Sequence, residues 1–404
     1  MSILTQTEQL LADPYPLYQE LRVQPSFEKI ENPLPTSKWA YVITRYDDVS
    51  TILKDRRFAN NPRVSSNPSN LADAWWTPKF FKSFMSNMLL QDNPDHMRLR
   101  NLVHKAFSPK MIKHLDSEIQ KITERLLDEM EDKGTVDLMA DFALPLPLIV
   151  IAEMMGVPEE DLDQFHQLSS AFVDQLPNSA WGILRLMTTF WTLERFFRKL
   201  ISAKTETPAD DLVSALVQAE QDGERLSEDE LVAMLFILLL AGHETTVNLI
   251  GNGVLALIEN PDQLETFKQN PGLVGTMTDE LLRYTNPVQH GVSRYATEDI
   301  WVGNNLIRKG DTVLLYLAAA NRDESVFENP DQLDITRQPN KHLAFGLGAH
   351  YCIGAPLAKL EAKWAFTMLF ERFPDLELAI PADQLEWRET TILRGLKSLP
   401  IKLT

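Results

Sequence analysis

The stretch that decides the fold of this chain is Phe345-Gly346-Leu347-Gly348-Ala349-His350-Tyr351-Cys352-Ile353-Gly354. Cys352 is the only cysteine among 404 residues, so it cannot form an internal disulfide or join a cage of several cysteines around a metal. A free cysteine is most often a small buried apolar residue with no chemical task. Three glycines within ten residues, however, permit unusual backbone angles and a close approach to a flat or bulky group.

The residues that follow give this thiol a special position. Ala355-Pro356 opens a helix predicted over Pro356–Phe373, and proline suits a first helical turn. A thiol just before a helix N-terminus lies near the positive end of the helix dipole, which favours the thiolate, the form that ligates metal. The pattern therefore favours a metal-binding thiolate over a glycine-rich turn with an incidental cysteine.

The ten-residue string resembles the heme-binding signature of the cytochrome P-450 family, F-G-x-G-x-H-x-C-x-G, with every fixed position filled. In that family the cysteine thiolate is the proximal ligand of the heme iron and pushes electron density toward it. The resemblance implies that Cys352 ligates the iron of heme b and that His350 lies near a heme propionate. It also places Phe345, Gly346 and Gly354 against the cofactor.

The composition is that of an ordinary globular chain, with 44% hydrophobic and 24% charged residues, and it allows a large core. The formal net charge of −18 argues against nonspecific binding to nucleic acid or to an anionic membrane. Residues Met1–Glu8 show no signal-peptide pattern, and the apolar stretch Leu231–Ala241 is too short to span a bilayer before His243 and Glu244 interrupt it. We therefore predict a soluble cytoplasmic protein, which a single cysteine also fits.

Neither an internal repeat nor a long linker divides the chain, so we expect one domain over residues 1–404. Apolar residues spaced near 3.6 predict helices at Lys110–Glu131, Leu144–Met155, Ala180–Lys204, Asp211–Gln221, Glu228–Glu259, Pro261–Lys268, Val274–Tyr284 and Pro356–Phe373. Short strands are predicted at Ala40–Thr44, Ile300–Val302 and Thr312–Leu317. The fold class is mainly α with small β-sheets. The family resemblance makes this a prism fold, with the heme between the long central helix and the cysteine loop.

The longest predicted helix begins at the capping box Ser227-Glu228-Asp229-Glu230 and ends before Asn260-Pro261. Its middle reads Ala241-Gly242-His243-Glu244-Thr245-Thr246. A glycine in a helix interior costs about 1 kcal/mol relative to alanine, so we expect close packing at Gly242. The carboxylate of Glu244 in an apolar helix points to a structural salt bridge or to a function. A zinc-protease motif is excluded, because Val247 stands where the second histidine would be.

This segment resembles the oxygen-activation motif of the same family, A-G-x-E-T-T. The resemblance implies that Thr245 forms a hydrogen bond to dioxygen or to its water, and that Glu244 helps to relay protons from solvent. A hydroxyl both donates and accepts, and a carboxylate can carry a proton repeatedly, which suits them to these roles. Small Ala241 and Gly242 would leave room above the porphyrin.

Three further residues match cofactor anchors of the family. His96 and Arg100 stand four residues apart and so share one face of a helix. Singly they would be read as surface charges, but together they resemble the H-x-x-x-R pair that contacts heme propionates. Arg294 matches a second propionate-binding arginine, and a guanidinium group can clasp a carboxylate with two hydrogen bonds.

Glu280 and Arg283 match the E-x-x-R pair of the family, which locks the fold together with a third arginine. The usual place of that arginine holds Gln332, in Pro330-Asp331-Gln332-Leu333, so Arg337 is the candidate for the third member. We assign these residues a structural role and no role in catalysis.

The substrate pocket is expected to be apolar. Its predicted lining is Met88, Leu89, Leu238, Val288, Val292 and Ile392, with Ala241, Thr245 and Gln289 nearby. The apolar stripe from Trp75 to Leu90 would normally be core, but the family resemblance places it over the distal pocket. Phe172–Ile183 is predicted to form a mobile lid.

The predicted activity is that of a heme-thiolate monooxygenase, which inserts one oxygen atom from O2 into a small apolar organic substrate. No flavin or iron–sulfur segment is visible, so electrons from NAD(P)H must arrive through a ferredoxin or flavodoxin with its reductase. Lys105, Lys110, Lys341 and Lys359 are a candidate docking patch, although exposed lysines are usually only solvated. We expect a monomer. The alternatives are a peroxide-using or atypical heme-thiolate enzyme, and a non-catalytic heme-binding protein.

Overall fold

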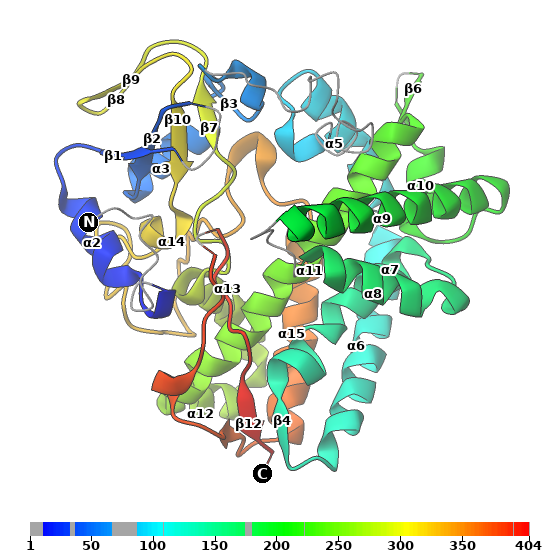
Figure 1. The fold of residues 1–404 in the computed structure, drawn as a ribbon. Helices are drawn as coiled ribbons and strands as arrows, with labels where there is room; N and C mark the ends of the chain where they lie inside the picture. The colour runs from blue at the N-terminus through cyan, green and yellow to red at the C-terminus, as the bar shows by residue number, and fades with distance from the viewer. Residues whose placement is uncertain are drawn as a thin grey trace. The chain divides into compact units, whose positions relative to one another are not determined.

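A computed structural model describes residues 11–32, 37–66, 87–107, 109–173, 180–221, 223–390 and 392–403 (Figure 1). The contacts group the chain into two compact units, which are described separately below. The first unit consists of residues 1–69, 123–145 and 245–404, and the second unit of residues 70–122 and 146–244. Two helices, α6 (Pro109–Glu131) and α11 (Glu228–Glu259), belong partly to each unit. The expected single domain therefore stays a prediction.

The first unit is organised around a five-stranded sheet with the order β1-β2-β10-β7-β3. Its strands are β1 (Glu28–Glu31), β2 (Trp39–Ile43), β10 (Thr312–Leu315), β7 (Arg294–Ala296) and β3 (Phe58–Ala59). β10 pairs with β2 in parallel, and the other neighbours pair antiparallel. Apolar side chains from one face of this sheet form a buried cluster with α3 (Tyr46–Lys54) and Leu343, just before the cysteine loop.

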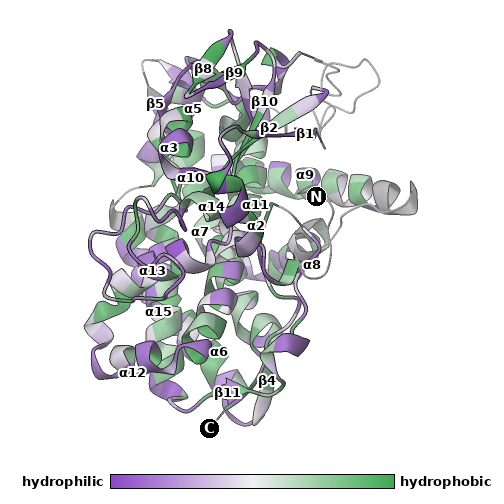
Figure 2. Ribbon diagram, turned by 90° about the vertical axis from the view of Figure 1, so that its left-hand side faces the viewer, coloured by the Kyte–Doolittle hydropathy of each residue, from purple (hydrophilic) through white to green (hydrophobic). Residues whose placement is uncertain are grey.

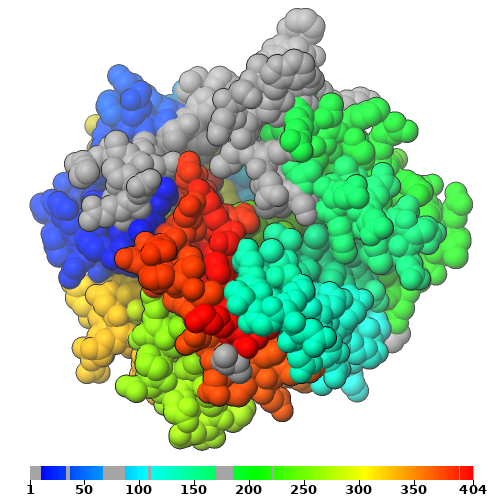
Figure 3. Space-filling model, turned by 60° about the horizontal axis from the view of Figure 1, so that its bottom comes forward, coloured from blue at the N-terminus to red at the C-terminus, as the bar shows by residue number. Residues whose placement is uncertain are grey.

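Two smaller sheets complete the strands of the first unit. β12 (Pro400–Lys402) lies between β11 (Glu377–Leu378) and β4 (Thr135–Asp137), and Figure 3 shows the red C-terminal segment beside the chain that carries β4. The other is the hairpin of β8 (Ile300–Val302) and β9 (Asn305–Ile307).

The remaining helices of this unit are α2 (Tyr15–Val23), α12 (Pro261–Gln269), α13 (Val274–Thr285), α14 (Leu317–Ala320) and α15 (Ala355–Arg372). α12 is mostly hydrophilic (Figure 2) and buries only Leu264 and Phe267.

The second unit is almost entirely helical. Its helices are α5 (Asp95–Ala106), α7 (Pro145–Met155), α8 (Leu162–Val173), α9 (Ala180–Glu206) and α10 (Leu212–Gln218), with the first halves of α6 and α11. α9 packs against both α8 and α10. The buried ring of Phe236 on α11 lies with its centroid 4.9 Å from that of Phe190 and 5.1 Å from that of Phe197, both on α9. These aromatic contacts join α9 to α11.

The predicted mainly helical fold with small sheets is confirmed, and most predicted elements differ from the observed ones by one or two residues at their ends. The helix predicted over Asp211–Gln221 is wrong at its C-terminal end. α10 stops at Gln218, and β5 (Glu220–Gln221) pairs with β6 (Glu224–Arg225). Gly223 in this hairpin has φ of 82°, a left-handed conformation that glycine adopts at little cost. The strand predicted to reach Leu317 ends at Leu315, where the chain turns into α14.

The long helix α11 has the predicted bounds Glu228–Glu259. The capping box is present, since the Ser227 backbone N–H donates to Glu230 at 2.8 Å and the Glu230 N–H donates to the Ser227 hydroxyl at 3.3 Å. By length and composition α11 passes a test for a membrane span, but 67% of its most apolar window is buried inside the protein. Such burial is what the core helix of a globular protein shows.

The carboxylate of Glu280 accepts hydrogen bonds from two arginines. Arg283 donates to both of its oxygens at 2.8 Å, and both side chains are fully buried. Arg337 donates through Nε at 3.1 and 3.2 Å, so it is the third member of the network, as predicted. Gln332 contributes only its backbone carbonyl to Arg283, and its side chain is exposed. The buried charges are thus paired and hydrogen-bonded, the condition under which burial is tolerated.

We predict that Glu280→Gln lowers the free energy of unfolding by about 3–5 kcal/mol, because it leaves two guanidinium groups without their counter-charge. Gln332→Ala is the matched control and should change it by less than about 0.5 kcal/mol, as for other exposed positions. Chemical denaturation of the heme-loaded protein measures both. Equal stabilities for the two variants would contradict the assigned network.

Candidate functional site

The loop that carries Cys352 is closed by its own backbone. The Cys352 N–H donates to the carbonyl of Phe345 at 2.9 Å, and the Gly346 N–H donates to the carbonyl of Leu343 at 2.8 Å. These bonds fold residues 343–352 back on themselves. The Cys352 thiol remains partly exposed and free of any disulfide.

Two glycines in this loop are required by geometry. Gly346 and Gly348 have φ of 67° and 72°, which side-chain-bearing residues rarely adopt. A Cβ on Gly348 would also lie 2.9 Å from the backbone carbonyl oxygen of Leu53, at the end of α3. The loop therefore packs against α3 too closely for any side chain at that position.

α15 starts three residues after Cys352. Ala355 and Pro356 occupy its first turn, and the Ala358 N–H donates to the Gly354 carbonyl at 2.9 Å. A Cβ on Gly354 would lie 3.9 Å from Cys352 Sγ. The sulfur is therefore close to the positive end of an 18-residue helix, which favours its thiolate form.

These residues fit a heme better than a bare metal ion. Within the described ranges no group of three or more His, Cys, Asp or Glu side chains is placed to hold an ion. A single cysteine would suit a metal that is held within a cofactor and needs only one ligand from the protein.

The middle of α11 is accessible although both flanks are buried. Residues 231–237 and 246–257 are all buried, whereas Ala241 between them is exposed. The partly exposed residues around it are Leu238, Leu240, Gly242, Glu244 and Thr245. This accessible patch contains both predicted catalytic residues and is where a bound group can contact the helix. Gly242 also packs closely, as predicted, since a Cβ there would lie 3.1 Å from Ile151 on α7.

The predicted propionate anchors lie on regular elements. His96 and Arg100 are one turn apart on α5, and His96 is 2% exposed. Arg98 between them pairs with Glu230 and with Glu224 at 3.5 Å. Arg294 lies in β7 opposite Val313 of β10, and it is buried in the same unit as Cys352. His350 ends the short helical turn Gly348–His350 in the cysteine loop.

The structure brings two of the predicted substrate residues together. Val288 pairs with Leu393 in an isolated β-bridge, and the Gln289 N–H donates to the Ile392 carbonyl at 2.8 Å. Ile392 is 52% exposed, as a residue at an open surface would be. The other predicted lining residues are Val292 beside Arg294, Leu238 in the accessible patch, and Met88 and Leu89 in the short helix Met88–Leu90.

Two further predictions lie largely outside the described residues. These are the aromatic stripe up to residue 86 and most of the lid over 172–183. Of the candidate docking lysines, Lys359 forms an ion pair with Asp279 at 2.6 Å, and Lys105 donates to the Glu220 carbonyl at 2.9 Å. Lys341 is exposed, and the side chain of Lys110 is not described. The docking patch stays a prediction.

The sequence did not indicate that α15 carries a buried carboxyl group, that of Glu361. Glu361 on α15 is 1% exposed, and burial raises the pKa of its carboxyl to about 8, against an opposing effect of a hydrogen bond from Thr246. Thr246 follows the predicted catalytic Thr245 on α11, so this contact joins α11 to the helix that begins after Cys352. Glu361 stands between Lys359 and Lys363 in the sequence, so no local pattern marks it as buried.

Comparison with known proteins agrees with this geometry. The family model described as cytochrome P-450 matches residues 23–271 and 272–402. The chain is 45% identical over 366 residues to the polyketide biosynthesis cytochrome P-450 PksS of Bacillus subtilis, covering 90% of this chain and 89% of the relative. It is 40% identical over 396 residues to a vitamin D(3) 25-hydroxylase of Pseudonocardia autotrophica, covering 97% of this chain and 94% of that protein.

Solved structures support the fold as well. The structure of PksS matches with a TM-score of 0.90 and 41% identity over 98% of both chains. A second match is P450BioI in complex with an acyl carrier protein ligated to hexadec-9Z-enoic acid, with a TM-score of 0.87 and 36% identity over 98% of this chain and 100% of that one.

We predict that Glu361→Gln stabilises the protein increasingly as pH rises from 5 to 8. Below pH 4.5, the ordinary pKa of a glutamate, the Glu361 carboxyl is protonated in both the folded and the unfolded protein. Above it the unfolded state ionises while the folded state stays neutral, so wild-type unfolding becomes easier by about 1.4 kcal/mol per pH unit up to the folded pKa of about 8. Thermal unfolding midpoints across this pH range measure the effect. Glu371→Gln, on the exposed side of α15, should show no such trend, and a parallel response of both variants would refute the assignment.

Proposed function

The chain belongs to the cytochrome P-450 family, a family of heme-thiolate monooxygenases, and from that premise we propose that it inserts one oxygen atom of dioxygen into an apolar organic substrate, with electrons from a separate redox protein. The second oxygen atom leaves as water after two electrons and two protons are supplied. The observation that carries the proposal is the accessible patch of α11, which presents Glu244 and Thr245 in a helix that is otherwise buried on both sides.

The cofactor would be held from its proximal side by Cys352. The bound heme would supply the iron at which dioxygen is reduced and its O–O bond is cleaved. The helix dipole of α15 supports the thiolate of Cys352, and the left-handed Gly346 and Gly348 allow the tight turn of the loop that carries it. His96, Arg100, Arg294 and His350 would bind the two propionates, since their ring and guanidinium nitrogens donate to carboxylates.

Proton delivery would be the task of Glu244 and Thr245. Both are partly exposed, so Glu244 can exchange protons with solvent and the Thr245 hydroxyl can hold dioxygen or a water by a hydrogen bond. Ala241, the most accessible residue of the patch, carries only a methyl group and leaves space beside the helix. The presence of this acid–alcohol pair favours use of dioxygen over use of peroxide, because peroxide already carries the electrons and protons that the pair helps to deliver.

The substrate is proposed to be a small apolar molecule. Val288 and Val292 are partly exposed and Ile392 is exposed, so all three offer apolar surface. The names and titles of the relatives point the same way. They include a vitamin D(3) 25-hydroxylase and solved complexes with corticosterone and with myristic acid. The electron donor would be a ferredoxin or flavodoxin with an NAD(P)H-dependent reductase, acting on a cytoplasmic monomer.

We predict that Cys352→Ser abolishes the thiolate-type absorption spectrum of the reduced carbon-monoxide complex and with it NAD(P)H-dependent product formation. A serine hydroxyl keeps the size of the side chain but not the soft anionic ligand. The test uses the heme-loaded protein with a ferredoxin and its reductase. An unaltered spectrum in the variant would show that Cys352 is not the ligand, and turnover supported only by peroxide would reject the proposed dioxygen chemistry.

We predict that Thr245→Ala diverts electrons from product to hydrogen peroxide, raising the peroxide-to-product ratio severalfold. The methyl group can neither hold nor donate a proton at the distal side. Thr245→Ser keeps the hydroxyl and should restore coupling. The yields of product and peroxide per NAD(P)H measure the ratio, and equal ratios in all three proteins would remove Thr245 from proton delivery.

A further inference from the structure

The rings of His290 and Tyr316 are neighbours in the first unit, with their centroids 5.2 Å apart and their planes at 43°. Tyr316 follows directly after β10, and its backbone N–H donates to the Ile43 carbonyl at 2.9 Å. His290 lies between α13 and β7, where the Gly291 N–H donates to the Leu315 carbonyl at 3.1 Å. Backbone hydrogen bonds therefore hold the two segments that carry these side chains.

The imidazole of His290 presents a hydrogen-bond acceptor. Its Nδ1 lies 3.0 Å from the carbonyl oxygen of Gly291. A carbonyl oxygen can only accept, so Nδ1 carries the proton and Nε2 of the neutral ring holds a lone pair. Burial lowers the pKa of His290 from its ordinary value of 6.5, against the opposing effect of the Gly291 carbonyl, so the ring is neutral near pH 7. Nε2 has no hydrogen-bond partner among the described residues and is not fully buried, so a donor from a ligand can reach it.

The hydroxyl of Tyr316 supplies a donor next to this acceptor. Tyr316 is 2% exposed, and burial raises the pKa of its hydroxyl, so the group keeps its proton at neutral pH. Tyr18 lies with its ring centroid 5.5 Å from that of Tyr316, but the Tyr18 hydroxyl donates to Gln289 at 2.7 Å. The Tyr316 hydroxyl has no such partner in the described part of the chain and is not fully buried. A phenol in so apolar a place usually has a hydrogen-bond partner, and a ligand can provide it.

The same segment carries residues that are proposed to contact the substrate. His290 stands between Val288 and Val292 in the sequence, and all three side chains are partly exposed. The N–H of the intervening Gln289 donates to the carbonyl of Ile392 at 2.8 Å. An apolar molecule that binds against these residues would therefore find the imidazole and the phenol within the same stretch of backbone.

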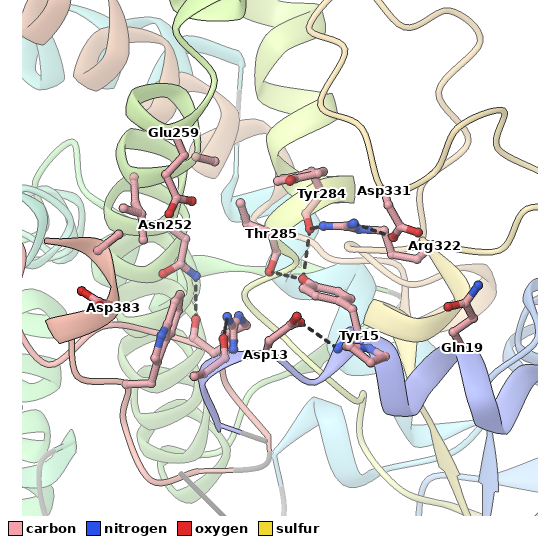
Figure 4. A pocket seen from close by; sticks show the side chains of 17 residues that line it. Asp13, Tyr15, Gln19, Asn252, Glu259, Tyr284, Thr285, Arg322, Asp331 and Asp383 are labelled. Carbon is pink, nitrogen blue, oxygen red and sulfur yellow. Dashed lines mark hydrogen bonds and ion pairs between the residues drawn. The ribbon is translucent and has the colours of Figure 1, made fainter. Parts of the chain in front are cut away.

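An unbound donor and acceptor distinguish this pair from the cavity of about 600 Å³ between α2 and the C-terminal half of α11 (Figure 4). In that cavity the Tyr15 hydroxyl donates to the Tyr284 carbonyl at 3.0 Å, and the Arg322 guanidinium donates to Asp331 at 2.8 Å. Those polar groups are bound to the protein itself.

Building on the proposed function, we propose that His290 and Tyr316 recognise a hydroxyl group of the substrate, which donates its hydrogen to His290 Nε2 and accepts the O–H of Tyr316. A hydroxyl can donate and accept at the same time. An ether or a ketone has no hydrogen for Nε2, and an ionised carboxylate has none either. The substrate class is therefore an apolar alcohol, and the two residues determine specificity without taking part in the oxygen chemistry.

Equilibrium dialysis of the heme-loaded full chain tests this proposal with two matched pairs of ligands. 1-Decanol is compared with 1-methoxydecane, and testosterone with androstenedione. In each pair the second compound keeps the apolar body but has no hydroxyl group. We expect saturable binding of at least one alcohol, at least about tenfold tighter than that of its hydroxyl-free partner.

Substitutions assign this preference to the two side chains. In Tyr316→Phe and in His290→Phe the alcohol should bind about tenfold more weakly, while the affinity of the hydroxyl-free partner changes little. His290→Gln keeps an acceptor and should recover part of the affinity that His290→Phe loses. Tyr46→Phe is the matched control and should bind like the wild type, because the Tyr46 hydroxyl donates to the Lys341 carbonyl at 2.7 Å.

The hydroxyl site is rejected if neither alcohol binds saturably, if the two members of each pair bind equally, or if both phenylalanine variants keep the wild-type preference. Dialysis requires no turnover, so a failure of the proposed function is seen separately, as a bound alcohol that gives no product with NAD(P)H and the redox proteins. Equal affinities together with product formation would reject the hydroxyl site alone.

Discussion

The buried carboxylate of Glu280 fixes the segment that leads to Cys352. Arg283, held by Glu280, donates to the backbone carbonyl of Asn321 at 2.9 Å, and the side-chain oxygen of Asn321 accepts the N–H of Leu343 at 2.7 Å. The Leu343 carbonyl then accepts the first hydrogen bond of the cysteine loop. Because each bond shares a residue with the next, a displacement of the carboxylate would be passed along to the loop of Cys352, the proposed iron ligand.

This arrangement explains how a fully buried charge cluster can be tolerated in the core. Both oxygens of Glu280 receive donors from Arg283 and Arg337, and the Asn340 side chain adds a third at 3.0 Å. The remaining N–H groups of the Arg283 guanidinium donate to backbone carbonyls of residues 321–332. This segment does not pair with a β-strand. The ion pair therefore replaces secondary structure as the support of an irregular segment.

The parts of the site that could be predicted are those in which chemistry demands particular residue types at short spacing. The Cys352 loop needs its glycines for positive φ, and α11 needs its capping box, so both can be recognised from neighbouring residues alone. Arg337 could be named as the candidate for the third arginine because Gln332 occupies the position that usually holds it. The hairpin after α10 was missed because the helical pattern continues from Gln218 to Gln221, although Glu220 and Gln221 pair with Glu224 and Arg225.

Residues whose meaning depends on distant neighbours could not be predicted. Glu361 is an ordinary helical glutamate in sequence, and only its burial against Thr246 makes it a neutral acid. Asn252 and Glu259 likewise line a cavity only because α2 and the C-terminal segment lie against this part of α11 (Figure 4). Periodicity identifies the faces of a helix but not what packs against each of them.

Contacts between α11 and α15 set the register between the turn that contains Thr245 and the helix that follows Cys352. Thr246 on α11 donates to Glu361 on α15, and two turns later Gly253 packs so closely on Phe366 of α15 that a Cβ there would lie 2.6 Å from the ring. Two separated contacts prevent α11 from sliding along α15. Since α15 begins three residues after Cys352 and Thr245 precedes Thr246, the proposed iron ligand and the proposed proton donor are positioned by one helix pair. A side chain at Gly253 would push α11 and α15 apart and would change the spacing of the proposed catalytic residues without replacing any of them.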